Sequence, residues 1–238
     1  MKLYKVGGAV RDELLGLHPH DIDYAVEAES YDEMKHYVLR IGGEIYQERP
    51  EYLCIRCNIP KLGPVDLTLC RKDGIYFDGR RPNSVEPCGI YEELSRRDFT
   101  VNAIAIDIET GEYIDPHNGR QDIKNKLIRC VGDAQERFGE DSLRLLRAIR
   151  FSITKGFDIE YSIARCLNDY GTVKTLDNAK VERWYEELRK CFGHDTLLTL
   201  KMLERFPVLR NKVFESELWL KLPKLMPTLE HRKGHKNG

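Results

Sequence analysis

Short apolar runs separated by turns make up the first half of the chain, a pattern typical of a sheet. The runs lie at residues 3–6, 22–26, 53–58, 65–70 and 103–108 and predict strands. Between the second and third runs, Ser30 and Glu33 form a capping-box pattern that predicts a helix to about residue 41, where Gly42 and Gly43 end it. Residues 109–112 have the composition of a hairpin turn that joins 104–108 to 113–115.

After about residue 125 the apolar positions follow the period of helices. We expect helices around residues 143–151, 159–170 and 181–192, and Pro207, Pro223 and Pro227 divide the remainder into short apolar helical pieces. The pattern therefore predicts an α+β protein: a head with a small mixed or antiparallel sheet and flanking helices (1–125), an all-helical neck (126–192) and a short helical body (193–238).

Composition adds that this is a globular protein, with 41% hydrophobic and 32% charged residues among 238. No apolar run reaches the eighteen residues of a membrane span, and the N-terminal residues 1–7 lack the apolar core of a secretory signal. The seven cysteines are odd in number and have no disulfide-like spacing, which fits a reducing compartment. We therefore expect a cytoplasmic protein that does not contact membranes.

The pair Cys54 and Cys57 has the C-x-x-C spacing of some zinc sites. Cys70 and Cys88 are the only nearby residues that could complete such a site. Three residues is an odd step along a strand, so alternation places the two thiols on opposite faces. This favours ordinary packing cysteines over zinc ligands.

Charge is nearly balanced overall, at −1, but it is unevenly distributed. Residues 201–238 hold nine lysines and arginines against four acidic residues, a net charge of +5. Such an excess can meet a phosphate backbone, or it can belong to a solvated helical end with a basic tail.

The N-terminal segment combines a glycine turn with two closely spaced aspartates. Gly7 and Gly8 open a short helical stretch that carries Arg11, and such a turn presents backbone N–H groups to phosphates. Asp21 and Asp23 are two positions apart, so on an extended strand their carboxylates point the same way and can hold divalent metal ions. Either feature alone is common in turns and loops; together they predict nucleotidyl transfer from a nucleoside triphosphate.

A second polar cluster lies directly before the last predicted strand, at residues 96–103. Arg97 can grip triphosphate oxygens in a forked contact. Asn102 or Asp98 can hold a ribose or orient Arg97. The alternative is a surface ion-pair cluster.

The run at residues 140–150 predicts selection of a base. Three-residue steps on a helix advance 300°, so we expect one winding stripe of Asp141, Arg144, Arg147 and Arg150 beside an apolar stripe of Leu143, Leu146 and Ile149. An aspartate can accept from an exocyclic amine while an arginine donates to the neighbouring ring acceptor, an edge that cytosine and adenine share. The alternative is a helix with ion pairs worth a few tenths of a kcal/mol each.

With these motifs in this order, the chain resembles the class II tRNA nucleotidyltransferases, the CCA-adding and poly(A) polymerase family of the DNA polymerase β-like superfamily. The resemblance extends over about residues 3–192. It implies addition of C and A to the 3′ end of tRNA from CTP and ATP, with Mg²⁺ as cofactor and pyrophosphate as product. The oligomeric state stays open.

The resemblance assigns roles to individual residues. Gly7, Gly8 and Arg11 match the triphosphate-binding turn, Asp21 and Asp23 the metal-binding pair, and Asp66 a third carboxylate that helps to activate the RNA 3′-hydroxyl. Residues 71–82 match the flexible loop of members that add A, and Arg97, Asp98 and Asn102 match the ribose and phosphate motif. Asp141 and Arg144 match the amino-acid template, with Arg147 and Arg150 beside it.

Further matches are structural, and two departures from the family accompany them. Asp115, Pro116 and Gly119 match the hinge between head and neck, and Glu182, Arg183, Glu187, Leu188 and Lys190 match the last motif. Lys180 stands where the family has Ser, which bears on the capping of that neck helix. The long body and tail that grip the tRNA elbow correspond to at most residues 193–238, which indicates a natural minimal enzyme or a truncated form.

Three alternatives to a CCA-adding enzyme stay open. A poly(A) polymerase shares every motif, and a CC-only enzyme would differ at the loop of residues 71–82. The third is a catalytically inactive module that binds RNA or nucleotides. Grouping Asp21, Asp23 and Asp66 beside a phosphate site argues against this last alternative, because grouped acids repel one another without metal.

Overall fold

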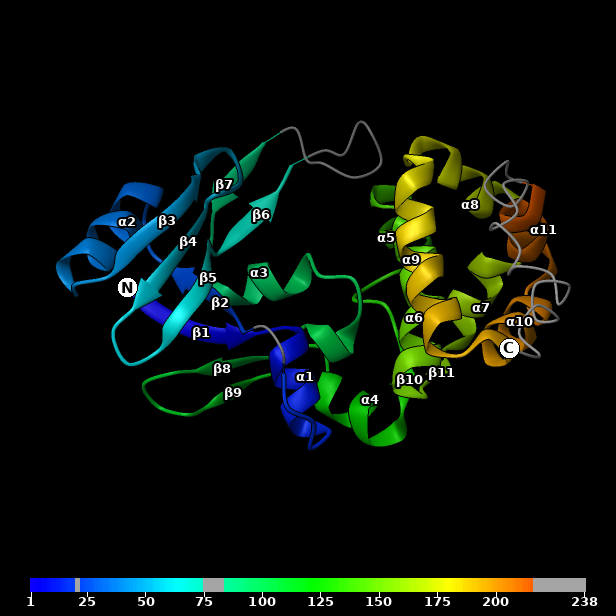
Figure 1. The fold of residues 1–238 in the computed structure, drawn as a ribbon, viewed down its shortest axis with the longest axis horizontal. Coiled ribbons are helices and arrows are strands. Elements are labelled where there is room, and N and C mark those ends of the chain that lie inside the picture. The colour runs from blue at the N-terminus through cyan, green and yellow to red at the C-terminus, as the bar shows by residue number, and fades with distance from the viewer. Residues whose placement is uncertain (20–21, 75–83, 216–238) are drawn as a thin grey trace, which may run out of the picture.

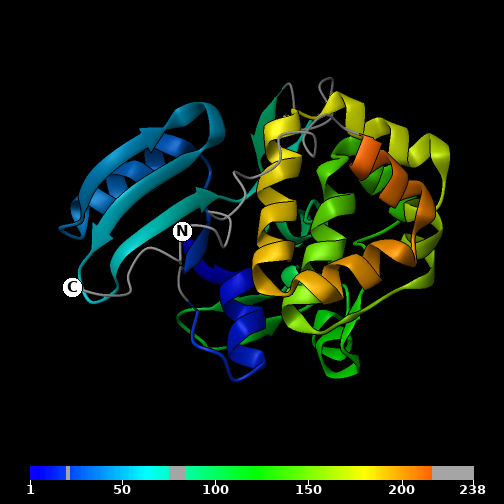
Figure 2. The ribbon, with the colours of Figure 1, turned by 45° about the vertical axis from the view of Figure 1, so that its right-hand side comes forward.

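The computed structural model describes residues 1–19, 22–74 and 84–215 of the chain. In the views of Figures 1 and 2, strands and a few helices occupy one end of the molecule, and helices with one short pair of strands occupy the other. This arrangement confirms the predicted α+β fold class. None of the helices in these three ranges is long and apolar enough to cross a membrane.

A mixed sheet forms the centre of the head. Its strands are β1 (Lys2–Val6), β2 (Asp23–Glu27), β3 (Glu44–Arg49), β4 (Cys54–Ile59), β5 (Gly63–Leu69), β8 (Ala105–Asp107) and β9 (Tyr113–Ile114). They lie in the order β3-β4-β5-β2-β1-β8-β9, and every neighbouring pair is antiparallel except β2 and β5. Two separate pairs accompany the sheet: the antiparallel β6 (Arg71–Asp73) and β7 (Val85–Pro87), and the parallel β10 (Leu127–Ile128) and β11 (Asp158–Ile159).

Helices flank this sheet and form the other end of the molecule (Figure 1). The head helices are α1 (Gly8–Leu14), α2 (Tyr31–Arg40), α3 (Ile90–Ser95) and α4 (Gly119–Asn125). They are followed by α5 (Ala134–Glu140), α6 (Leu143–Lys155), α7 (Tyr161–Leu167), α8 (Tyr170–Lys174), α9 (Val181–His194), α10 (Thr196–Glu204) and α11 (Pro207–Glu215). Short 3-10 turns lie at Pro50–Tyr52, Thr100–Asn102 and Thr175–Asn178.

Three apolar clusters hold these elements together. Met34 and Val38 of α2 pack against one side of the sheet, and Ile90 and Leu94 of α3 lie in a second cluster with β1 and β8. The third and largest cluster begins in the head at α1 and continues through α6 and α9 to α11. The head and the helical region therefore share one core.

Most of the predicted elements are confirmed. All five apolar runs contain strands, and the Ser30 hydroxyl caps α2 by accepting from the Glu33 N–H at 3.1 Å. The Glu33 carboxylate accepts from the backbone N–H of Glu29 at 2.7 Å, one residue earlier than in an ideal capping box. Cys54 and Cys57 lie on opposite faces of β4, where Cys57 is buried.

Two predictions of secondary structure are wrong. The helix expected over residues 159–170 is interrupted: residues 158–159 pair with β10, α7 covers seven residues, and the Asp169 side chain caps α8 by accepting from the Thr172 N–H. Asp141 does not lie on the helix that carries the arginines, because it ends α5 in extended conformation and α6 begins at Leu143. In addition, strand β3 was not predicted, since it lies at the sheet edge and has only one partly buried residue, Ile45.

Candidate active site

The glycine turn lies at the start of α1, beside the cleft between head and helices. Gly7 has φ +71°, a conformation that side-chain-bearing residues rarely adopt. A Cβ at Gly7 would lie 2.6 Å from Nη1 of Arg97, and a Cβ at Gly8 would lie 3.4 Å from Nη2 of Arg11. Glycine at position 7 thus allows both the turn and the close approach of Arg97 to the backbone.

Two of the three predicted catalytic acids are neighbours on the sheet. Asp23 and Asp66 are register partners on the parallel strands β2 and β5, and both are exposed. They also line one cavity of about 370 Å³. Asp66 forms an ion pair with Arg56 on β4 at 3.1 Å. Asp21, the third predicted acid, lies outside the described residues, as does most of the predicted loop at residues 71–82.

The donor set formed by Asp23 and Asp66 suits a hard divalent cation. Magnesium prefers carboxylate oxygens and retains waters, and exposed aspartates on adjacent strands, about 4.8 Å apart, offer both oxygens and access to water. Among the described residues no group of three or more acids, histidines or cysteines is placed to hold a metal ion. A site here would therefore need Asp21 as well as Asp23.

A chain of hydrogen bonds links the first arginine of the head to the helices. Arg11 donates to the Asn102 side-chain carbonyl at 2.5 Å, Asn102 donates to Asp98 at 3.0 Å, and Arg147 of α6 makes two contacts with Asp98 at 2.8 and 2.5 Å. Burial disfavours the Asp98 carboxylate, but Arg147 and the hydrogen bond from Asn102 outweigh it and hold the Asp98 pKa well below its ordinary value. Asp98 therefore stays ionised and joins the two parts of the site.

Arg97 is held by a residue that the sequence reading missed. Its guanidinium donates to the Glu93 carboxylate at 3.0 Å and to the backbone carbonyl of Asn102 at 3.3 Å. The side chains of Asp98 and Asn102 bind Arg147 and Arg11 rather than orienting Arg97, and the alternative expectation, that they hold a ribose, stays a prediction. Glu93 is 1% exposed and lies four residues before Arg97, so the i,i+4 spacing on α3 was the available signal.

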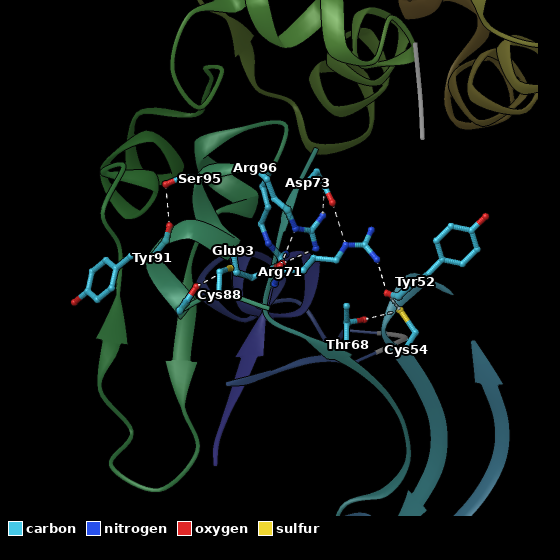
Figure 3. A network of polar contacts seen from close by, with 12 residues as sticks. Tyr52, Cys54, Thr68, Arg71, Asp73, Cys88, Tyr91, Glu93, Ser95 and Arg96 are labelled. Carbon is cyan, nitrogen blue, oxygen red and sulfur yellow. Dashed lines mark hydrogen bonds and ion pairs between the residues drawn. The ribbon is translucent and has the colours of Figure 1, made fainter. Parts of the chain in front are cut away.

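Glu93 also belongs to a polar network at the base of the β6–β7 ribbon (Figure 3). It accepts two hydrogen bonds from Arg96, each at 2.8 Å, and one from the Arg71 backbone N–H at 3.2 Å. Arg96 and Arg71 both form ion pairs with Asp73 on β6. The β6–β7 ribbon is thus tied to the same carboxylate that holds Arg97.

The proposed base-selecting pair lies at the junction of α5 and α6. The Asp141 carboxylate accepts from the Leu143 N–H at 3.1 Å, and burial raises the Asp141 pKa although the Arg144 cation opposes the shift. Arg144 is 6% exposed and donates to Glu140 at 2.8 Å and to the backbone carbonyls of Arg137 and Arg96, each at 3.1 Å. Both side chains reach the cleft, but from a loop and a helix rather than from one helix face.

The last two arginines of the stripe are anchored differently. Arg147 binds Asp98 of the head, whereas Arg150 binds Glu187 of α9 at 2.5 Å. Leu143, Leu146 and Ile149 are buried beside them, which confirms the predicted apolar stripe. At the start of α9, Lys180 provides no side-chain cap, in line with its departure from the family's Ser.

These groups meet in one cleft of about 870 Å³ between head and helices. Its lining includes Gly7, Gly8, Arg11, Asp23, Arg97, Asp98, Asn102, Asp141, Arg144, Arg147 and Arg150, and also Arg96, Phe151 and Lys190. Of the described residues predicted for the site, only Asp66 is not among them, and it shares the neighbouring cavity with Asp23. The cleft is dominated by cations, as a site for a polyanion with bound metal requires.

A family model and several known proteins are similar to this chain in sequence. The family model described as Poly A polymerase head domain matches residues 3–129. The CCA-adding enzyme of Streptococcus pyogenes is 38% identical over 188 residues, which are 79% of this chain and 44% of the relative. That of Streptococcus uberis is 40% identical over 190 residues, 79% of this chain and 45% of the relative. The chain spans about half the length of the curated relatives it matches.

Solved structures give the same result for the fold. The crystal structure of the Bacillus stearothermophilus CCA-adding enzyme in complex with CTP matches with a TM-score of 0.72 and 32% identity, over 90% of this chain and 51% of that one. A tRNA nucleotidyltransferase complexed with a primer tRNA and an incoming ATP analog matches with a TM-score of 0.73 and 32% identity, over 90% of this chain and 59% of that one.

Proposed function

The chain belongs to the family of poly(A) polymerase head domains, and we propose on this basis that it adds C and A to the 3′ end of tRNA, using CTP and ATP. The observation that carries the proposal is the cleft in which the glycine turn, six arginines and Asp141 come together beside Asp23. Relatives named as CCA-adding enzymes, and their structures with CTP or with primer tRNA and an ATP analog, support the same substrates.

In this proposal the cations of the cleft bind the nucleotide. Gly7 and Gly8 give the triphosphate access to backbone N–H groups, and Arg11 and Arg97 neutralise its charge. Asp98 and Asn102 hold the ribose or keep Arg147 and Arg11 in place for it. Asp141 and Arg144 select the base, with Arg147 and Arg150 beside them; for a base to be read, Arg144 must exchange some of its present acceptors for the base edge.

The predicted catalytic acids supply the second half of the chemistry. Asp21 and Asp23 would hold two Mg²⁺ ions, and Asp66, the register partner of Asp23, would help to activate the RNA 3′-hydroxyl. The ions, when bound, stabilise charge on the triphosphate and lower the pKa of the attacking hydroxyl. Arg97 and Arg11 then face the charge that develops as pyrophosphate leaves.

We further assign the head to residues 1–125, the neck to 126–192 and a short body to 193–238. The seven thiols lie free among the described residues, which suits a reducing cytoplasm.

The test uses tRNA transcripts that end before C, after C and after CC, each incubated with CTP, ATP or both. We expect completion of CCA by the wild type and loss of incorporation in Asp23→Asn, with Asp32→Asn, an exposed acid at the start of α2, as the matched control. Incorporation of ATP alone onto every transcript would favour a poly(A) polymerase, and a stop after CC would indicate a CC-adding enzyme. Absence of any extension with magnesium would refute catalysis and leave a nucleotide- or RNA-binding module.

A further inference from the structure

One aromatic ring in the cleft contacts three guanidinium groups. Phe151 lies on α6 and is 5% exposed. The central carbons of Arg150, Arg11 and Arg147 lie 4.1, 5.0 and 5.4 Å from its ring centroid. All three distances are within the range of about 6 Å over which a cation is attracted to the electron-rich face of an aromatic ring.

The three cations come from both sides of the head–neck junction. Arg11 belongs to α1 of the head, whereas Arg147 and Arg150 belong to α6. Each has its own carboxylate partner: Arg11 pairs with Asp12, Arg147 with Asp98, and Arg150 with Glu187. The carboxylates lie on three different elements, so they hold the guanidiniums separately. Phe151 is the neighbour that all three share.

The orientation of this ring is itself determined by the head. Phe99, which is fully buried and follows Asp98 directly, packs edge-on against Phe151 at 5.8 Å between centroids and 84° between ring planes. Such an edge-to-face pair is a preferred arrangement of two aromatic rings and limits rotation of either one. Phe151 therefore presents a fixed surface to the arginines. Its ring contacts Arg11 and Arg147, the two ends of the series of hydrogen bonds that runs through Asn102 and Asp98.

We propose that Phe151 is a positioning residue: its ring holds Arg11 of the head in alignment with Arg147 and Arg150 across the head–neck junction, so that Arg11 is placed to bind the triphosphate of an incoming nucleotide. The identity of the ligand rests on the proposed function. An aliphatic side chain of similar volume would fill the same space but would not attract the guanidiniums, because it has no quadrupole. The three cations would then repel one another into a broader set of rotamers.

The test compares Phe151→Leu, Phe151→Tyr and Phe157→Leu in the full chain. Phe157 is a matched control, because it is 2% exposed in the same apolar cluster and no guanidinium contacts its ring among the described residues. We measure binding of CTP and of CMP by calorimetry, and unfolding by urea. Phe151→Leu is expected to weaken CTP binding about tenfold and CMP binding less than about twofold, since the loss of one or more such contacts has this magnitude.

The other variants separate positioning from packing. Phe151→Tyr keeps the ring and is expected to retain CTP affinity within about threefold of the wild type. Phe157→Leu is expected to lose stability while the ratio of CTP to CMP affinity stays unchanged. If Phe151→Leu leaves that ratio unchanged, or if Phe157→Leu lowers it equally, the positioning role is overturned.

A second measurement reads the geometry without any ligand. The ring current of Phe151 displaces the NMR signals of the Nε–H groups of Arg11, Arg147 and Arg150, and these displacements are expected to disappear in Phe151→Leu and to persist in Phe151→Tyr. Signals that do not change in Phe151→Leu would overturn the inference. Failure of the wild type to bind CTP would refute the proposed function, and the arginine signals would then still decide whether Phe151 aligns the cations.

Discussion

Replacing Asp98 by asparagine tests the central ion pair between the head and the helices. Asp98 is 8% exposed and accepts two short contacts from Arg147, at 2.8 and 2.5 Å. Asparagine is nearly isosteric and retains one oxygen that can accept from the N–H of Phe99 and the amide of Asn102, as the carboxylate does now. The substitution therefore removes the charge and leaves most of the remaining geometry in place.

The expected loss of stability follows from how deeply each partner of the Asp98–Arg147 ion pair is buried. Removing one partner of a buried ion pair costs about 3–5 kcal/mol, because the other charge is left without compensation. The Arg147 side chain is 34% exposed, so water can replace part of the lost interaction. We therefore expect Asp98→Asn to lower the free energy of unfolding by about 2–3 kcal/mol, and the melting temperature by roughly 5–10 °C for a chain of this size.

The pH dependence of the stability difference between the wild type and Asp98→Asn identifies the charge of Asp98 as the cause of that difference. The pKa of Asp98 in the folded protein lies below its value in the unfolded chain, about 3.9, so folding is stabilised while the group is ionised in both states. That contribution is complete above about pH 5 and is lost as the pH falls through 3.9 toward the lower, folded-state pKa. Wild type and Asp98→Asn should therefore differ by a constant amount between pH 8 and pH 5 and converge below about pH 4.

Urea unfolding at several pH values measures this difference. The control is Asp158→Asn, because Asp158 is an exposed acid on β11 and its substitution should change stability by less than about 0.5 kcal/mol. When Arg147→Gln is already present, adding Asp98→Asn should lower the free energy of unfolding much less than Asp98→Asn does in the wild type, since the ion pair is already broken. A difference at pH 7 under about 0.5 kcal/mol, or one that persists unchanged at pH 3, would refute the argument.

Three further predictions concern the remaining parts of the site. Gly7→Ala should slow nucleotide incorporation more than Gly16→Ala does, since both have φ +71° but only a Cβ at position 7 meets Arg97; equal rates would contradict this. Glu93→Gln should raise the KM for nucleotide about tenfold with a smaller change in kcat, whereas Glu92→Gln, the exposed neighbour, should change neither. The Cys57 thiol, whose pKa burial raises to about 11, should react with a disulfide reagent at pH 8 only in urea; rapid reaction of the native protein would show that this thiol is accessible.

Strands β4 and β5 could be predicted because each buries one face. In β4 and β5 the buried residues alternate with exposed ones, and Asp66 lies at an exposed position between Val65 and Leu67. Strand β3 lacks this alternation, because an edge strand can satisfy half of its backbone groups with water and needs no apolar face. Its sequence therefore contains no periodic signal for a strand.

The errors in the helical region arose where polar side chains interrupt a continuous apolar period. Asp169 accepts from the N–H and the hydroxyl of Thr172 and so starts a new helix inside the predicted one. Asp141 likewise binds the N–H of Leu143 and ends α5, although its three-residue spacing from Arg144 fits a helix. Short polar side chains compete with the helical backbone for its hydrogen bonds, and apolar periodicity does not register this competition.

Residues of the site were recognised where a sequence motif groups them. Their interaction partners were missed where those partners lie in other elements of the structure. Arg97 and Asp98 are adjacent, yet Arg97 is held by Glu93 of α3 and Asp98 by Arg147 of α6. The Arg97–Glu93 contact follows the local i,i+4 spacing, whereas the contact of Arg147 with Asp98 depends on the approach of α6 to the head, and this approach is set by tertiary packing. Phe151 belongs to the same class, because its role depends on three partners that only the folded protein brings together.

The spacing of the cations in the cleft is determined by the core beneath them. Arg11 directly follows Val10, and Arg147 and Arg150 directly follow Leu146 and Ile149; all three apolar residues are at most 1% exposed and belong to the cluster that joins head and helices. The backbone at each arginine is therefore fixed by the packing of its neighbour, and only the side chain remains to be oriented. Carboxylates of three elements and the Phe151 ring supply that orientation. A cleft built in this way is already arranged for a polyanion before one binds, so less binding energy is spent on ordering its side chains.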